Sequence, residues 1–197
     1  MKVIYVIGGI CNGKSILGKS FAQKGAVYFD LDKISQFVLE KPEVIEQVKK
    51  LSDDVVVENG IIDKEAFQDY LFSNKLVTHA FDRAIFPHIK EELDRQLSDL
   101  DDDSIVVVEY SGYFGDSRDE DIFLKDADAV VWVESRLKDK IELGKKRGIE
   151  NFELTWRMRV QPYDEEYEAV ADYVIHNNST IEALDERIDE IWASCCK

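Results

Sequence analysis

The feature that most constrains the fold is a glycine-rich turn between an apolar run and a helical pattern near the start of the chain. Residues 3–7 read Val-Ile-Tyr-Val-Ile, a length and β-branching typical of a strand buried in a parallel sheet. Residues 14–23 space their apolar side chains as one face of a helix does. The turn overlaps this helix, and residues 8–15 fit the pattern G-x-x-x-x-G-K-[ST]. The sequence therefore predicts a strand, a phosphate-binding turn and a helix in direct succession.

The chemistry of phosphate binding explains each position of this pattern. Glycines let the backbone approach phosphate oxygens, and successive N–H groups form an anion-binding nest at the positive end of the helix. Lys14 would place a positive charge on the β- and γ-phosphates, and the Ser15 hydroxyl can ligate Mg²⁺. The alternative is a glycine-rich turn that carries a surface lysine. The residues of this segment predicted to bind ATP are Gly8, Gly9, Ile10, Cys11, Asn12, Gly13, Lys14, Ser15 and Ile16.

Strands and helices alternate along the rest of the chain. Short apolar runs predict four more strands, at residues 26–29, 105–108, 129–133 and 173–175. Helical patterns cover residues 32–40, 43–51, 64–72, 76–97, 136–146, 152–160 and 180–192. In the pattern of residues 76–97, Leu76 falls on the apolar face and Pro87 predicts a kink or a restart. The alternation predicts a three-layer α/β fold with a five-stranded parallel sheet, and 197 residues suit a single domain.

The motif alone names no reaction, but what surrounds it narrows the choice. A GTPase would carry N-K-x-D, whereas the nearest string, at residues 74–77, lacks the aspartate. A motor or transport ATPase would be longer and would usually end its third strand in aspartate, where this chain has Glu109. A short chain with an acid after its second strand favours a small-molecule kinase and hence the P-loop kinase fold.

Composition disfavours several other classes of protein. The net charge of −16 argues against nucleic acid as a partner, and no apolar run reaches 18 residues, so we expect no membrane span. Three cysteines cannot form a disulfide framework, and they predict a cytoplasmic protein. We expect the protein to be a monomer or a weak homo-oligomer. Cys195 and Cys196 read as a tail. Cys11 lies in the turn, where a helix N-terminus lowers a thiol pKa, although a tolerated small residue is the simpler interpretation.

Three acids follow predicted strands. Asp30 and Asp32 come at the carboxyl end of the second strand, the edge at which open parallel sheets bind ligands. An acid there can accept the proton of a hydroxyl or hold Mg²⁺ through water. The alternative for Asp32 is that it caps a helix beginning at Lys33. Glu109 has the same placement on another strand and suggests a role near a metal or the acceptor.

A set of motifs in fixed order resembles the dephospho-coenzyme A kinase family along most of the chain. Besides the P-loop, these are Asp30-Leu31-Asp32, Asn59-Gly60-Ile61-Ile62-Asp63, Pro87, Arg157-Met158-Arg159-Val160-Gln161 and Ala171-Asp172-Tyr173-Val174-Ile175 with Asn177-Asn178. Some family positions differ: the histidine before Pro87 is Phe86, with His88 next to it, and an arginine of the lid is Lys146. Other differences are Ser111-Gly112-Tyr113-Phe114-Gly115, Gln36, Glu142 and Ser179.

The resemblance implies transfer of the γ-phosphoryl group of MgATP to the 3′-hydroxyl of dephospho-coenzyme A. In that interpretation Asp32 orients or deprotonates the hydroxyl, and Arg157 stabilises charge on the transferred group. The helical stretch of about residues 33–100 would form the acceptor side, and about 136–161 the lid. The catalytic residues would be Lys14, Asp32 and Arg157; the ATP site would add Lys146 and Arg147; the acceptor site would be Asp30, Asp32, His88 and Glu109; and the metal ligand would be Ser15.

Two other functions remain open at this point. A kinase of another nucleoside, nucleotide or small alcohol is favoured if the altered positions changed the acceptor. A regulatory protein that binds nucleotide without turnover is the alternative outside the enzymes. Trp156, in the lid pattern, could stack on adenine.

The distribution of charge fits an anionic ligand despite the acidic total. Residues 1–33 carry five basic and two acidic side chains, and residues 136–159 carry eight basic and four acidic ones. The negative excess therefore lies outside the predicted phosphate turn and lid. This predicts a locally positive site on an acidic protein and ATP binding that weakens with added salt.

Overall fold

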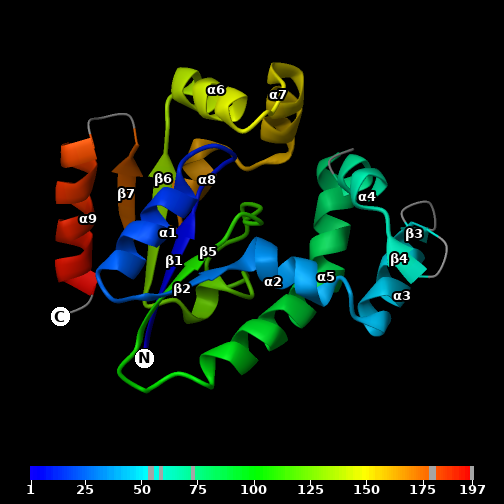
Figure 1. Cartoon of the computed structure of the whole chain (residues 1–197), viewed down its shortest axis with the longest axis horizontal. Coiled ribbons are helices and arrows are strands. Elements are labelled where there is room, and N and C mark those ends of the chain that lie inside the picture. The colour runs from blue at the N-terminus through cyan, green and yellow to red at the C-terminus, as the bar shows by residue number, and fades with distance from the viewer. Residues whose placement is uncertain (53–55, 58–59, 72–73, 178–180, 196–197) are drawn as a thin grey trace. The chain divides into compact units, whose positions relative to one another are not determined.

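A parallel sheet of five strands organises the fold of the computed structural model, which describes residues 1–52, 56–57, 60–71, 74–177 and 181–195 (Figure 1). Its strands run in the order β2-β5-β1-β6-β7. They are β1 (Lys2–Ile7), β2 (Val27–Asp30), β5 (Ile105–Glu109), β6 (Ala129–Glu134) and β7 (Tyr173–His176). All five predicted strands are confirmed, with bounds that differ by one residue at most. Each pair is parallel, so the carboxyl ends of all five strands meet at one edge of the sheet.

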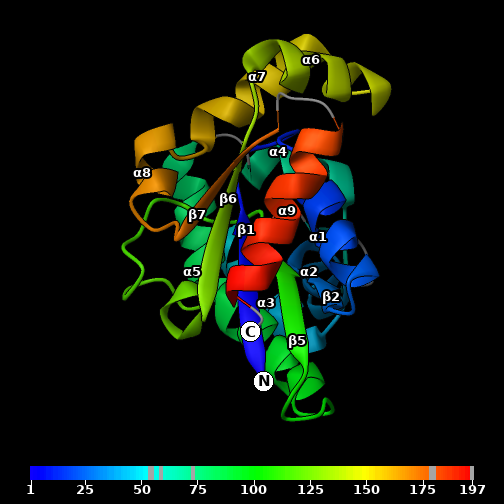
Figure 2. The ribbon, with the colours of Figure 1, turned by 90° about the vertical axis from the view of Figure 1, so that its left-hand side faces the viewer.

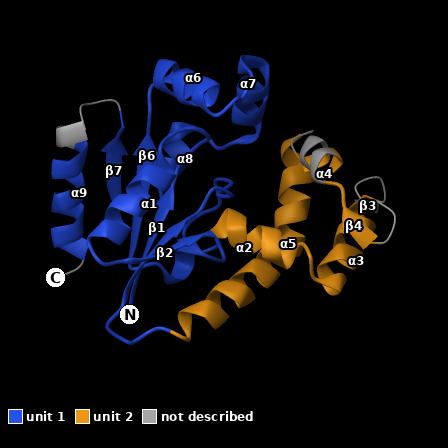
Figure 3. Ribbon diagram, in the orientation of Figure 1, with its two compact units in different colours: residues 1–30, 100–197 blue, residues 31–99 orange. Residues whose placement is uncertain are grey.

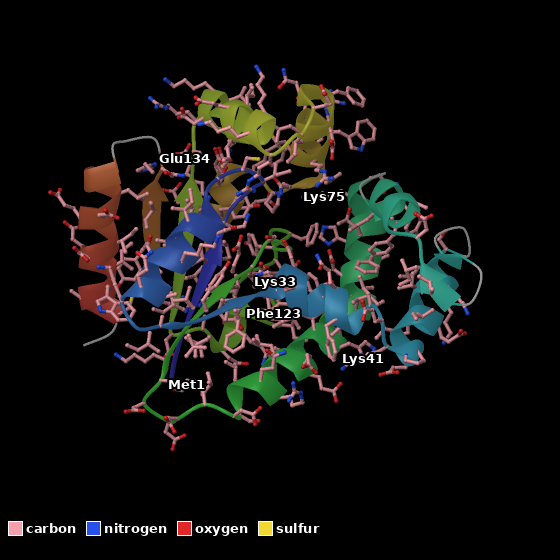
Figure 4. All side chains as sticks on the ribbon, in the orientation of Figure 1. Met1, Lys33, Lys41, Lys75, Phe123 and Glu134 are labelled. Carbon is pink, nitrogen blue, oxygen red and sulfur yellow. The ribbon has the colours of Figure 1, made fainter. Side chains whose placement is uncertain are left out.

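Helices cover both faces of the sheet and give the predicted three layers. On one face, α1 (Lys14–Gln23) and α9 (Ile181–Cys195) pack on the core. That core is Ile4, Val6, Leu17, Phe21, Ala26, Val107, Ala129, Val131, Val133, Ile175, Ile188 and Ile191. On the other face, Phe123 (labelled in Figure 4) packs with Tyr110, and Tyr167 of α8 (Asp164–Glu168) stacks on Trp132. Trp132 is therefore buried, as its place in a predicted strand indicates.

Two more helices lie beyond the carboxyl ends of the strands. They are α6 (Leu137–Lys146) and α7 (Asn151–Val160), and both views place them at that end of the sheet (Figures 1 and 2). A short 3₁₀ helix, η3 (Leu124–Asp126), precedes β6. The lid predicted over residues 136–161 thus corresponds to two helices at the ligand-binding edge of a parallel sheet.

The last helix contacts α1 and the start of β1. The rings of Phe21 in α1 and Trp192 in α9 are 5.9 Å apart, and Lys2 Nζ in β1 donates to the Cys195 carbonyl oxygen at 2.9 Å. Cys196 lies outside the described residues.

The chain divides into two compact units (Figure 3). Residues 1–30 and 100–197 form the α/β unit, and residues 31–99 form the helical unit. The helical unit holds α2 (Leu31–Val38), α3 (Pro42–Leu51), the antiparallel pair β3 (Val56–Val57) and β4 (Ile61–Ile62), α4 (Lys64–Leu71) and α5 (Lys75–Leu97). The single kinase domain over residues 1–197 stays a prediction.

Pro87 and Leu76 test two expectations for the helical unit. Helix α5 continues through the exposed Pro87, so the predicted restart is wrong, whereas the axis of α5 bends between its two ends, as the predicted kink requires (Figure 1). Leu76 is 82% exposed and does not belong to the buried face, because α5 begins at Lys75 with Asn74 as its cap. The Asn74 side chain accepts from the Val77 N–H at 3.1 Å. Of the predicted Asn59-Gly60 turn, Asn59 lies outside the described residues.

Among the described residues, no helix is both long and apolar enough to cross a bilayer.

Candidate active site

The phosphate loop, residues 8–15, connects β1 to α1 in a conformation that needs glycine. Gly8 and Gly13 have positive φ angles of 144° and 98°, which L side chains rarely adopt. A Cβ on Gly8 would lie 2.5 Å from the Val133 carbonyl oxygen, so the loop also comes too close to β6 for any side chain there. Cys11 has a φ of 59° and is buried, so this thiol fills a left-handed position that usually favours glycine.

Several backbone N–H groups of the loop are available to an anion. Within the described residues, the N–H groups of Cys11, Gly13 and Ser15 donate to no acceptor. They cluster at the N-terminus of α1, whose first turn contains no acidic residue. Unused donors at the positive end of a helix are what a phosphate needs. This geometry supports the predicted phosphate nest.

Lys14 folds back over the loop that carries it. Its Nζ donates to the carbonyl oxygens of Gly8 at 2.8 Å and Gly9 at 3.1 Å, and the residue is only 7% exposed. A buried ammonium is stable only when it is hydrogen-bonded, and these carbonyls supply the partners. The charge is therefore held beside the same loop whose N–H groups are unused.

Glu109 joins Ser15 to the second strand. The Ser15 hydroxyl donates to Glu109 Oε1 at 2.8 Å, and the Tyr28 hydroxyl donates to Oε2. Glu109 is 6% exposed, and the β2–β5 register sets it beside Asp30. Parallel partners project to the same face of the sheet, so both acids lie on the α1 side. Tyr28 was not predicted, although its position two residues before Asp30 on the same strand could have suggested it.

Asn12 is fixed from two neighbouring strands. The side-chain Nδ2 of Asn12 donates to the Val133 carbonyl at 2.7 Å. The backbone carbonyl oxygen of Asn12 accepts from Ser135 Oγ and from Asn177 Nδ2, both at 2.9 Å. Asn177 follows β7 and donates its N–H to the carbonyl of Glu134, labelled in Figure 4, at 2.7 Å. The motif that ends in Asn177 thus reaches the phosphate loop. Ser135 was missed because no local pattern marks it; Asn178 and Ser179 lie outside the described residues.

The predicted lid cations have carboxylate partners on their own helices. Lys146 Nζ lies 3.0 Å from Glu142 Oε1, and Arg157 Nη2 lies 2.6 Å from Glu153 Oε1. Arg147 is exposed at the end of α6. The Lys146–Glu142 pair is exposed and therefore weak, whereas the Arg157 side chain is only 24% exposed. The predicted contacts of these cations with ATP stay predictions.

Trp156 contacts another aromatic ring. It stacks on Phe152 with ring centroids 6.2 Å apart, and 41% of it is exposed. Its predicted contact with adenine stays a prediction.

The remaining acceptor-side residues belong to the helical unit. Asp32 is exposed in the first turn of α2, and His88 is half-buried on α5. Helix α2 begins at Leu31, so the alternative in which Asp32 caps a helix starting at Lys33 is wrong. A carboxylate in the first turn is still favoured by the helix dipole.

The described residues contain no cluster of three or more His, Cys, Asp or Glu side chains able to hold a metal. A metal held by one hydroxyl and by ligand phosphates does not need such a cluster.

A three-layer α/β unit whose first strand enters this loop defines the chain as a P-loop kinase, an ATP-dependent phosphotransferase. The family model described as Dephospho-CoA kinase matches residues 2–183. The chain therefore belongs to the dephospho-CoA kinase family, which confirms the resemblance seen in its motifs.

Individual relatives agree with this assignment. The dephospho-CoA kinase of Thermobifida fusca is 26% identical, over 98% of this chain and 95% of its own. Among solved structures, TT1252 from Thermus thermophilus matches with a TM-score of 0.78 at 24% identity, over 98% and 97% of the two chains. The dephospho-CoA kinase from Campylobacter jejuni matches with a TM-score of 0.57 at 17% identity, over 98% and 97%. At these identities the structures show the fold alone.

Proposed function

We propose that this chain transfers the γ-phosphoryl group of ATP to the 3′-hydroxyl of dephospho-coenzyme A, giving coenzyme A and ADP. The observation that carries the proposal is the phosphate loop in a chain of this family, with three unused N–H donors beside the Lys14 ammonium. These positive groups complement the negative charge of the β- and γ-phosphates, and the bond that breaks lies between those two phosphates. Phosphoryl transfer needs little covalent chemistry from the protein, so most of the rate acceleration comes from positioning the reactants and stabilising charge.

The oxygens around Ser15 fit Mg²⁺. Mg²⁺ prefers oxygen ligands and usually takes one or two from the protein, with phosphates and water supplying the rest. The Ser15 hydroxyl donates a hydrogen bond to Glu109, so the lone pairs of Ser15 Oγ remain available to a cation. When bound, Mg²⁺ would neutralise charge on the β- and γ-phosphate oxygens. Glu109 then fixes the direction of the Ser15 hydroxyl.

On the acceptor side, Asp32 is the proposed group that accepts the hydroxyl proton. It is exposed in the first turn of its helix, so a substrate hydroxyl can reach it. Asp30, His88 and Glu109 complete the predicted acceptor residues. Phe86 and Gln36, which differ from the family pattern, are the reason to test the acceptor directly.

In the lid, Arg157 is proposed to stabilise charge on the transferred group, with Lys146 and Arg147 contributing to ATP binding. Lys146 stands where the family has arginine, and a lysine cannot make the bidentate contact that a guanidinium makes with phosphate. We therefore expect Arg157 to matter more than Lys146.

The decisive experiment measures steady-state ADP release with a panel of acceptors: dephospho-coenzyme A, adenosine, AMP, shikimate and a simple sugar. Stimulation by dephospho-coenzyme A above all others is expected. Stimulation by a different acceptor would replace the proposed substrate and keep the kinase. ATP binding without stimulation by any acceptor would favour the regulatory alternative.

Asp32→Asn tests the acceptor side separately, with Asp94→Asn on an exposed face of α5 as control. A general base contributes about 10²- to 10⁴-fold, so we expect a loss of kcat in that range with ATP affinity unchanged. Wild-type kcat in Asp32→Asn would remove this role. A cytoplasmic, monomeric or weakly associating protein completes the proposal, with sedimentation as the test of the oligomeric state.

A further inference from the structure

Gln161 connects the end of the lid to the phosphate loop. Its side-chain Oε1 accepts a hydrogen bond from the backbone N–H of Ile10 at 2.9 Å, across 151 residues of sequence. Gln161 directly follows α7, where the backbone leaves the helix with a φ of −80° and a ψ of 158°. The family-like motif that ends in Gln161 therefore reaches the loop through its last residue.

The loop is shaped to admit this side chain. A Cβ placed on Gly9 would lie 3.0 Å from Gln161 Oε1, tighter than ordinary van der Waals contact. Glycine at this position thus leaves room for the amide oxygen as well as for phosphate. The bond also occupies the Ile10 N–H, so this donor is separate from the unused donors of Cys11, Gly13 and Ser15.

A second contact joins the lid to the same loop. Gly144 of α6 is buried, and a Cβ there would lie 3.9 Å from Cys11 Sγ and 3.3 Å from Leu154 of α7. At Gly144 the two lid helices therefore pack together and near the loop. Arg157 lies four residues before Gln161, about one helical turn away.

We propose that Gln161 is a positioning residue for phosphoryl transfer. By holding the Ile10 N–H it fixes the base of α7 to the phosphate loop, and through this link it sets where Arg157 meets the transferred group. Gln161 acts through Arg157 and the loop backbone, and it does not touch the reacting atoms. The kinetic part of this proposal rests on the proposed function.

The test compares Gln161→Met, which keeps the length of the side chain and removes the hydrogen-bond acceptor, with Gln161→Glu, which keeps an acceptor oxygen. Gln23→Met, at the exposed end of α1, is the matched control. The measurements are hydrogen exchange at the Ile10 amide without ligand, kcat and KM for ATP, and the melting temperature.

For Gln161→Met we expect faster exchange at Ile10 and a kcat lower by about 10- to 100-fold, because misplacement of a catalytic group costs this much. The KM for ATP should change by less than about 3-fold, since the loop donors remain. Gln161→Glu should retain slow exchange at Ile10 and a kcat closer to that of the wild type, with a raised KM because of its added negative charge.

A double-mutant cycle with Arg157→Ala distinguishes positioning from a general structural role. If Gln161 acts through Arg157, Gln161→Met should cost much less in the Arg157→Ala background than alone. Additive losses, or wild-type kcat in Gln161→Met despite faster exchange, would overturn the proposal. Unchanged exchange at Ile10 would overturn it at the first step.

The outcome is separable from that of the proposed function. Kinetics are measured with whichever acceptor of the panel gives the fastest turnover, so failure of dephospho-coenzyme A alone leaves this test intact. If no acceptor gives turnover, exchange at Ile10 with and without ATP decides whether Gln161 holds the loop.

Discussion

Buried charge is handled differently in the two units. In the α/β unit, Lys14, Glu109 and Asp121 each have hydrogen-bond partners; Asp121 accepts from the N–H groups of Phe123 and Leu124 at 2.8 and 2.9 Å. In the helical unit, Asp82 on α5 is 7% exposed, and its Oδ2 has no partner among the described residues.

The two buried carboxylates of α5, Asp82 and Glu92, show how partners change the pKa of a buried acid. Burial raises the pKa of Asp82 to about 8. Hydrogen bonds from Arg95 and Gln96 lower the pKa of Glu92, against the effect of burial, to about 2. Lys41 (labelled in Figure 4) lies 3.5 Å from Glu92 and adds to this. On α5, hydrogen-bond partners therefore decide which buried acid keeps its charge. In the α/β unit, burial still raises the pKa of Asp121 despite its hydrogen bonds, so partners reduce the effect of burial without always cancelling it.

Removing the charge of the loop should have the largest effect. Lys14→Met is expected to lower kcat/KM by about 10²- to 10³-fold, because a fixed charge beside the transferred group is lost. Steady-state ADP release measures it, and Lys19→Met, exposed on the same helix, should be near wild type. Full activity in Lys14→Met would remove the loop from the mechanism.

Gly18→Ala should displace the Tyr28 ring and so disturb its hydrogen bond to Glu109. A Cβ on Gly18 would lie 2.4 Å from the Tyr28 ring, whose hydroxyl holds Glu109. Helix propensity alone predicts stabilisation by about 1 kcal/mol, whereas overpacking predicts a loss of about 1–3 kcal/mol. We expect the loss in chemical denaturation, together with reduced activity. A stabilised variant would show that Tyr28 moves freely, and Tyr28→Phe then measures the hydroxyl alone.

Asp82→Asn should relieve the buried acid of the helical unit, with a sign that depends on pH. The folded pKa of Asp82 lies above the unfolded value of 3.8. Between about pH 4 and pH 8 the unfolded chain releases a proton that the folded chain keeps, so the free energy of unfolding falls as pH rises.

At pH 8 the variant should therefore be more stable by about 1–2 kcal/mol, or roughly 2–8 °C in melting temperature. The gain should shrink toward pH 5. Asp94→Asn, exposed on the same helix, is the control. A pH-independent difference would mean that Asp82 is ionised in the folded protein.

Lys146→Ala should have the smallest effect on stability. The lysine side chain is 69% exposed and its partner Glu142 is similarly exposed, so the change should stay under about 0.5 kcal/mol. Thermal denaturation checks this, with Lys138→Ala on the same helix as the comparison. A loss as large as that of Gly18→Ala would show that exposed lid charges contribute as buried ones do.

The sheet could be predicted because its strands are continuous apolar runs. Burial on both faces leaves a strong signal in residues 3–7 and 105–108, and it does not depend on distant neighbours. The order of the strands could not be predicted in this way, because β5 takes its place between β2 and β1 by pairing with strands that lie far from it in the sequence. The two-residue strands β3 and β4 are too short to form a pattern. At Pro87 the local rule is only partly met, because α5 bends along its length but does not end there.

The site shows the same division. Lys14 and Ser15 follow from a local motif, and the alternation of β2 could have suggested Tyr28 from Asp30. Ser135 leaves no local signal, because its contact with Asn12 depends on how β6 lies beside the loop. The partners of Lys146 and Arg157 could have been predicted, since Glu142 and Glu153 lie four residues before them on a helix. Gln161 was visible in a motif, but its contact with Ile10 depends on how the chain returns to the loop.

The bond between Lys2 Nζ and the Cys195 carbonyl oxygen bears on how this chain could be rewired. Because the Lys2 side chain reaches the end of α9, we expect a short linker to join residues 2 and 195. New ends would then open at the exposed residues 101–103, between α5 and β5. In this circular permutant the helical unit, now an insertion in the α/β unit, would become a carboxyl-terminal appendage. The phosphate-binding unit would be synthesised as one uninterrupted stretch, so the helical unit could be shortened or exchanged from its free end.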